Sequence, residues 1–145
     1  MKKLFLLLVV LIVGMAPMLA DNDKMITREE LPKEAQRFLT QHFEGIEVLY
    51  VKADRDMGVV TSYDVVLEGD VKVEFNRSGD WTSVDCEKGR VPNGVLPRGV
   101  LDYVTKRFAE AYVVEIEKGL RGYEVKLSND IDLEFDKDGK FMRVD

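Results

Sequence analysis

The segment YDVVLEGDVKVEFNRSG, residues 63–79, returns further along the chain as YEVKLSNDIDLEFDKDG, residues 123–139. In both copies apolar residues alternate with charged or polar ones, which is typical of antiparallel strands with one face on a core and the other in water. A short polar connection, 68–70 or 128–130, divides each copy and predicts a hairpin turn. We therefore expect two β-hairpins of the same build.

An amphipathic helix is expected before each of these hairpins. Leu31-Pro32 recurs as Leu96-Pro97, and a helix that starts at a proline loses nothing from the missing N–H group. The apolar residues that follow recur at the spacing of one helical face. They are Ala35, Phe38, Leu39, His42 and Phe43 in the first copy, and Val100, Tyr103, Val104 and Phe108, with Arg107 in the place of His42, in the second.

The sequence thus predicts an α+β fold, a tandem repeat of a helix followed by four antiparallel strands (αβ4–αβ4), with the helices packed on one face of the sheet. The remaining strands are expected near 46–53, 81–86, 113–117 and 141–144, so that the repeats span about 26–86 and 91–145. Unequal spacing of the matching positions places a short insertion of the first copy within Asp54 to Ser62. Whether the two repeats share one sheet stays open.

Residues 1–20 have the pattern of a signal peptide. Lys2 and Lys3 precede the apolar run from Leu4 to Val13, and Ala20 suits the last position before cleavage. A transmembrane anchor is the alternative, but a bilayer core needs about 20 apolar residues and this run is half as long. We expect a mature domain over 21–145, located in the periplasm, with no stable membrane insertion after cleavage.

The charge of the chain limits the classes of partner. Its net charge is −6, and removal of Lys2 and Lys3 would change it to −8. Such a chain is disfavoured as a binder of nucleic acid or anionic membranes, since these need clustered lysine and arginine. A basic protein or a cation remains compatible with it. Cys86 is the only cysteine, so no intramolecular disulfide can form.

The sequence offers no constellation typical of catalysis, so we expect no catalytic residues, no cofactor and no enzyme activity. Asp136-Lys-Asp138-Gly139 resembles the start of a calcium loop, but the rest of that loop is missing and the same residues suit a tight turn. The single histidine, His42, is expected at the edge of an apolar stripe rather than in a metal site. Cys86 is interpreted as a small, partly buried thiol.

Four residues are candidate contacts for a protein partner, namely Tyr50, Lys72, Glu74 and Trp81. Tyr50 is matched by the charged Glu115 in the second copy, so the repeat pattern does not require Tyr50 in the core. Lys72 and Glu74 are expected on the solvent face of the sheet. Trp81 is matched by Phe141, and both could instead cap the core.

The motifs LPxxAxxFLxxxF at 31–43 and GYEVKLSNDIDLEFDKDGKF at 122–141 resemble the PepSY-like exported proteins, also called β-lactamase-inhibitor-like, from Bacteroides-type bacteria. The resemblance covers about 26–145. It implies a fold similar to that of inhibitors that clamp β-lactamases and carries no agreed catalytic residues. We expect a periplasmic module that binds an envelope protein, as an inhibitor or regulator of an envelope enzyme. The alternatives are a small-ligand or cation-binding protein, and a hydrolase that uses a carboxylate or Cys86.

Overall fold

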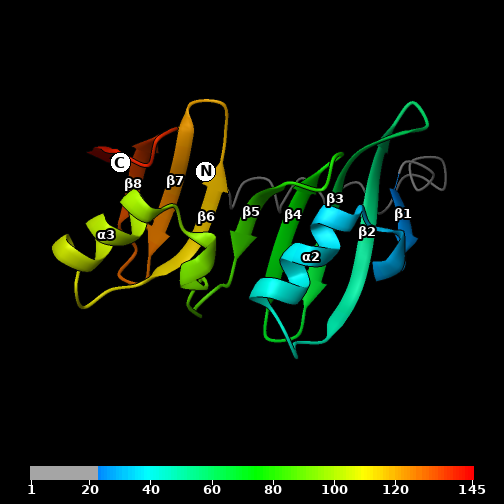
Figure 1. The fold of residues 1–145 in the computed structure, drawn as a ribbon, viewed down its shortest axis with the longest axis horizontal. Coiled ribbons are helices and arrows are strands. Elements are labelled where there is room, and N and C mark those ends of the chain that lie inside the picture. Colours follow the sequence, from blue (N-terminus) through cyan, green and yellow to red (C-terminus); the bar gives the residue numbers. More distant parts are fainter. Residues whose placement is uncertain (1–22) are drawn as a thin grey trace, which may run out of the picture.

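The computed structural model describes residues 23–145, which form one antiparallel sheet of nine strands (Figure 1). The strands are neighbours in the sheet in the order in which they follow in the chain. The predicted signal peptide, residues 1–20, lies outside the described part. The strands are β1 (Asp23–Ile26), β2 (Val48–Asp56), β3 (Val59–Leu67), β4 (Val71–Asn76), β5 (Trp81–Asp85), β6 (Val113–Lys118), β7 (Gly122–Leu127), β8 (Asp132–Asp136) and β9 (Phe141–Val144).

Two helices of ten residues, α2 (Lys33–His42) and α3 (Arg98–Arg107), lie on the same face of this sheet (Figure 1). Each follows a proline at its N-cap, where the lack of an N–H group leaves no helical hydrogen bond unmade. Short 3-10 turns precede them, η1 (Arg28–Glu30) and η2 (Asn93–Val95). A capping box stands at the N-terminus of η1, where the backbone N–H of Thr27 donates to Glu30 Oε2 over 2.7 Å.

The hydrophobic core lies between the helices and the face of the sheet that they cover. The alternating apolar residues of the strands point into it, and the helices add their apolar stripes. Complete burial of one such side chain stabilises the fold by about 1.5–3 kcal/mol. The largest side chains in this layer are those of Phe75, Phe135, Leu39, Leu67, Ile116, Leu127 and Leu133, all of which are fully buried.

The prediction of an α+β tandem repeat, a helix followed by four strands and then the same again, is wrong. The molecule is mostly β, with two short helices against a continuous sheet of nine strands. The segment Asp23–Ile26, for which no strand was expected, adds β1 along the outer edge of β2. The two expected repeats also pair directly with each other. Ser83, Val84 and Asp85 of β5 lie opposite Glu117, Ile116 and Glu115 of β6. All nine strands therefore form one meander, which answers the question that the sequence left open.

The hairpin of β2 and β3 is the longest in the sheet and projects beyond its neighbours (Figure 1). Both strands have nine residues, whereas β6 and β7 have six. The extra length falls within Asp54 to Ser62, where the insertion was expected. At the tip Met57 has φ 51° and is 92% exposed, followed by Gly58 with φ 79°. The insertion thus extends a hairpin and does not disturb the core.

Candidate partner-binding surface

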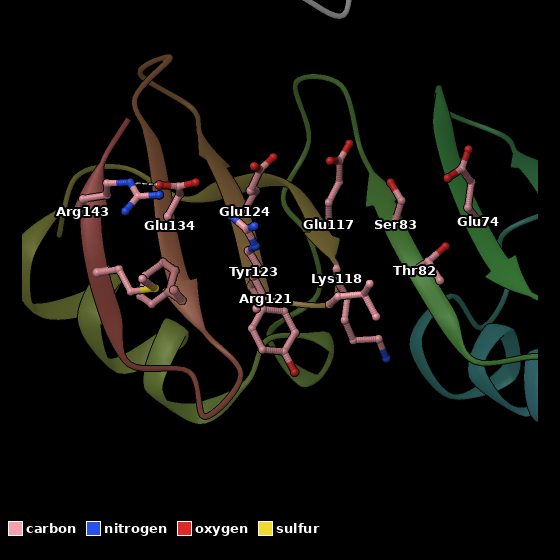
Figure 2. Close-up of a pocket in the computed structure, with 15 residues that line it drawn as sticks. Glu74, Thr82, Ser83, Glu117, Lys118, Arg121, Tyr123, Glu124, Glu134 and Arg143 are labelled. Atoms are coloured by element: carbon pink, nitrogen blue, oxygen red, sulfur yellow. Dashed lines mark ion pairs between the residues drawn. The ribbon is translucent and has the colours of Figure 1, made fainter.

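Among residues 23–145, no helix covers the face of the sheet opposite α2 and α3, and a row of acidic side chains crosses this face, which we call the open face. The strand register places Asp64 opposite Glu74, Glu74 opposite Ser83, and Ser83 opposite Glu117. Glu117 in turn faces Glu124, which faces Glu134. We call Asp64, Glu74, Glu117, Glu124 and Glu134 the acidic row. Figure 2 shows its labelled members from β4 to β8 in one line across the strands.

A basic residue stands at each end of the acidic row. Lys52 lies opposite Asp64, and Arg143 lies opposite Glu134, with which its guanidinium forms an ion pair. Lys52 Nζ lies 3.6 Å from Asp23 Oδ2, 3.4 Å from Asp54 Oδ1 and 3.5 Å from Asp64 Oδ2. Lys52 therefore joins β1, β2 and β3 on this face.

The two carboxyl groups beside Lys52 have opposite pKa shifts. Burial, a hydrogen bond with Asp54 and the charges of Asp54 and Glu74 raise the pKa of Asp64 to about 7. Burial also opposes the ionisation of Asp54, but hydrogen bonds from Asp64 and Ser62 and the charge of Lys52 lower its pKa. Burial opposes the protonation of Lys52 too, yet the three carboxylates around it raise its pKa. Below about pH 7, the protonated Asp64 can thus donate a hydrogen bond to the ionised Asp54.

The middle and far part of the acidic row line a shallow groove with a volume of about 760 Å³. The β6–β7 turn forms part of its wall, and there Leu120 is 91% exposed. Met142 of β9 lines the same groove and is half exposed. The groove therefore combines carboxylates with the two apolar side chains and with the basic side chains of Lys118, Arg121 and Arg143.

Three of the four residues predicted from the sequence as partner contacts lie on this face. Glu74 belongs to the acidic row, and Tyr50 and Lys72 both lie opposite Val66 in the neighbouring row. Tyr50 and Lys72 are exposed.

Trp81 lies on the other face, at the edge of the core. A bulge in the pairing of β4 and β5 sets Trp81 opposite the buried Phe75 and Ser83 opposite the exposed Glu74. The Trp81 ring packs 6.3 Å from Phe38 of α2 and 6.4 Å from Tyr123 of β7, measured between ring centroids. The structure therefore groups Tyr50, Lys72 and Glu74 and separates Trp81 from them.

Sequence reasoning missed the acidic row as a continuous feature. Period-two alternation places Glu124 and Glu134 on the solvent face, but it does not say which residues are direct neighbours across the strands. The register of β5 with β6 decides this, because it brings Glu117 into line through Ser83. No local sequence signal marks that register.

The chemically reactive side chains outside the acidic row have structural roles. Cys86 is a free, buried thiol whose pKa is raised to about 11 by burial and by the neighbouring Asp85. His42 packs 4.7 Å from Phe38 between ring centroids, and burial lowers its pKa. Asp136 accepts hydrogen bonds from the backbone N–H groups of Asp138 and Lys140, each over 2.9 Å, as a turn residue does.

Within residues 23–145, no group of three or more histidine, cysteine or acidic side chains is arranged to hold a metal ion. In the same part of the chain, no helix has the length and apolar character needed to cross a membrane.

A model of one protein family, described as "Putative beta-lactamase-inhibitor-like, PepSY-like", matches residues 61–143. Among solved structures, the chain is similar to a "putative calcium-regulated periplasmic protein" of Bacteroides thetaiotaomicron. The two share 38% identity and a TM-score of 0.81 over 87% of this chain and 98% of the other. No curated protein matches the chain.

Two periplasmic proteins of Bacteroides vulgatus are also similar in structure. One has 36% identity and a TM-score of 0.80 over 87% of this chain and 98% of its own. The other, of unknown function, has 31% identity and a TM-score of 0.78 over 85% of this chain and 98% of its own. These relatives match nearly their full length, so the likeness extends over the whole described sheet.

Proposed function

The chain belongs to the PepSY-like, β-lactamase-inhibitor-like family of periplasmic proteins, and from that premise we propose that it is a protein-binding module without catalytic activity. The protein itself is periplasmic, as are these relatives. The single observation that carries the proposal is the open face of the nine-stranded sheet, on which the described residues place charged side chains and a groove. Within residues 23–145, α2 and α3 pack on one face, while the other face carries charged side chains and the groove.

The chemistry of the described side chains favours binding over catalysis. A nucleophilic cysteine needs a low pKa, and burial moves the pKa of Cys86 in the opposite direction. His42 contacts the ring of Phe38 on its own helix, and among residues 23–145 it forms no ion pair or hydrogen bond with Cys86 or with a carboxylate. Asp64 has a raised pKa, but it is held by Asp54 and Lys52 within the sheet.

We place the contact surface on the open face, with Tyr50, Lys72 and Glu74 among its residues. Tyrosine is one of the side chains that dominate interface energetics, and a backbone already fixed in a sheet needs no further ordering on binding. The family description supports the finer proposal that the partner is an envelope enzyme that this protein inhibits or regulates.

The test is capture of the partner from an envelope extract of the native host, with crosslinking and mass spectrometry. The triple variant Tyr50→Ala, Lys72→Ala, Glu74→Ala should lose at least tenfold of the captured partner. The matched control is Arg37→Ala, Thr40→Ala, Gln41→Ala. These three residues are exposed on α2, which lies on the opposite side of the sheet from the open face. Equal capture by both variants would remove the open face as the contact surface, and no specific capture by the wild type would contradict the binding function.

A second candidate function is the binding of a small ligand or cation. The relative from Bacteroides thetaiotaomicron is described as calcium-regulated, which favours testing this ion first. A ligand at 100 times its Kd stabilises a protein by about 2.7 kcal/mol, which a thermal unfolding curve detects easily. A shift of Tm with CaCl2 that MgCl2 does not reproduce would support calcium binding, and unchanged curves with both salts would contradict it.

A further inference from the structure

We propose that the outer edge of β9 binds an extended segment of the partner as an added strand, antiparallel to β9. The inference rests on the proposed protein-binding function and adds the place and the chemistry of one contact. It commits to a partner segment with an apolar residue opposite Val144 and an acidic residue opposite Arg143.

The internal repeat shows how the same edge is used within the chain. The strand β9 repeats β5, so that Val84 is matched by Val144. On the inner side Val84 pairs with Val73 of β4, and Val144 pairs with Leu133 of β8. On the outer side β5 pairs with β6, where Val84 lies opposite Ile116. Among residues 23–145, no strand occupies the matching side of β9.

The two matched valines differ in exposure. Val84 is fully buried, whereas Val144 is 57% exposed. Because their inner neighbours are equivalent, we attribute the difference to β6, which lies beside β5 only. A partner strand in the corresponding place would cover Val144 as β6 covers Val84, and the burial of apolar surface favours such binding.

The backbone of β9 is oriented to bind a strand on this side. The N–H of Asp145 donates to the carbonyl of Asp132 on β8 over 2.9 Å. Successive residues of an antiparallel ladder bond to opposite neighbours, so the N–H and C=O groups of Val144 point away from β8. The first copy has the same order, since the N–H of Cys86 donates to the carbonyl of Val114 on β6 over 2.9 Å.

The chain already fills the equivalent place on β2. In the repeat β2 corresponds to β6, with Val51 matched by Ile116, and β1 pairs along its outer side. Ile26 of β1 lies opposite Val51, just as Val84 lies opposite Ile116. Of the two edges that correspond to the junction of β5 and β6, the described residues therefore cover the one on β2 and leave the one on β9.

The junction of β5 and β6 also indicates the chemistry of the partner segment. Ile116 lies opposite the counterpart of Val144, and Glu117 lies opposite the counterpart of Arg143. The side chain of Arg143 is ion-paired with Glu134 on β8 but is 61% exposed, and its guanidinium has further N–H groups for a second carboxylate. The ion pair draws this charge toward β8, so it does not shield the edge as charged side chains of edge strands often do.

The probe is a labelled peptide with the sequence AYVVEIEKG of residues 111–119, which contains β6. A second peptide has proline in place of its isoleucine, because proline cannot donate to a neighbouring strand. The protein is the form purified from the periplasm. Its variant Val144→Pro loses the N–H that points away from β8, a change that an edge strand tolerates. The matched control is Val144→Thr, which keeps this N–H and a β-branched side chain.

We expect the first peptide to bind the wild type at least tenfold more tightly than the proline peptide does. Val144→Pro should weaken binding of the first peptide at least tenfold, and Val144→Thr less than threefold. In the wild type, saturation with the first peptide should slow hydrogen exchange of the Val144 amide at least tenfold, as measured by NMR. This measurement locates the peptide even if circular dichroism shows that Val144→Pro is not folded.

Equal binding of both peptides, or unchanged hydrogen exchange at Val144, would overturn the proposal. A dimer of the wild type that Val144→Pro dissociates in analytical ultracentrifugation would also overturn it, because a second copy would then occupy the edge in place of a partner strand.

Capture of the native partner separates this inference from the function on which it rests. If Val144→Pro captures as much partner as the wild type, the edge of β9 is excluded as a contact while the binding function stands. If the wild type captures no partner, the binding function itself fails.

Discussion

Lys118 lies over the indole ring of Trp81, with Nζ 4.4 Å from the ring centroid. The ring is also held between Phe38 and Tyr123, so a helix and two neighbouring strands meet around it. This is the region where β5 passes into β6 and the helix layer changes from α2 to α3 (Figure 1). On the face that carries the helices, Trp81 of β5 therefore links α2 to the strands β6 and β7.

Replacement of this side chain should cost stability. Trp81→Ala removes the aromatic contacts and leaves a cavity, so we expect a loss of about 3 kcal/mol in the free energy of unfolding. Trp81→Phe keeps part of the packing and should lose less than half as much. Urea unfolding followed by circular dichroism measures both variants, because fluorescence of the only tryptophan disappears with it. A stable Trp81→Ala variant that fails to capture the partner would instead assign Trp81 to binding.

Asp64 makes the stability of the protein depend on pH in an unusual direction. Its pKa in the folded state is raised from 3.8 to about 7, so between these values the folded state holds a proton that the unfolded state releases. This contribution to stability is complete below about pH 4 and is lost as pH rises through 7. Asp64→Asn keeps a neutral group that can still donate to Asp54. It should stabilise the protein by about 1 kcal/mol at pH 8.5, after allowance for solvent screening, and have little effect at pH 5.

Urea unfolding at the two pH values tests this expectation. The matched control is Asp132→Asn on the same face, whose carboxylate is exposed. A difference between wild type and Asp64→Asn that is the same at pH 5 and pH 8.5 would contradict the raised pKa. Comparison with the wild type at each pH removes the contribution of the other titrating groups.

The sequence was a good guide to local structure because each signal for it is local. The alternation at 63–67 and 71–75 lies within β3 and β4, and the prolines at 32 and 97 directly precede α2 and α3. The strand β1 (Asp23–Ile26) carries no such alternation. It is recognised as a strand only through its antiparallel pairing with β2. The predicted unit of one helix and four strands, repeated once, gave the wrong fold class, because the nine strands form one continuous sheet that dominates the structure.

The candidate surface was only partly predictable for the same reason. Lys72 and Glu74 could be assigned to the solvent face from alternation, and Tyr50 was chosen because its counterpart Glu115 is charged, but Trp81 could not be assigned to either face. The bulge after Glu74 lets Trp81 and Ser83, two residues apart, point to opposite sides of the sheet. A bulge and a register between distant strands are tertiary features, and they decide which charges become neighbours.

Gly99 in the first turn of α3 should not tolerate a side chain, although alanine is the better helix former by about 1 kcal/mol. A Cβ atom at this position would collide with the backbone carbonyl of Gly139 in the β8–β9 turn. We expect Gly99→Ala to destabilise the protein by about 1–3 kcal/mol, because backbone has to move to make room. Gly119→Ala is the control, since its nearest neighbour would be 3.9 Å away. Equal urea midpoints for the two variants would show that α3 is free to shift on the sheet.

Cys86 should be unreactive while the protein is folded. Its side chain is 4% exposed, and burial with the charge of Asp85 raises its pKa to about 11, so little thiolate is present at pH 8. We expect the thiol reagent DTNB to modify the native protein at least a hundredfold more slowly than the protein in 8 M urea. The rate in intermediate urea should follow the unfolding curve. Rapid modification of the native protein would show that the β5–β6 connection opens to solvent, and it would return Cys86 to the list of candidate nucleophiles. Cys86→Ser should then abolish any hydrolytic activity that depends on it, whereas a slow native reaction leaves the thiol as part of the core.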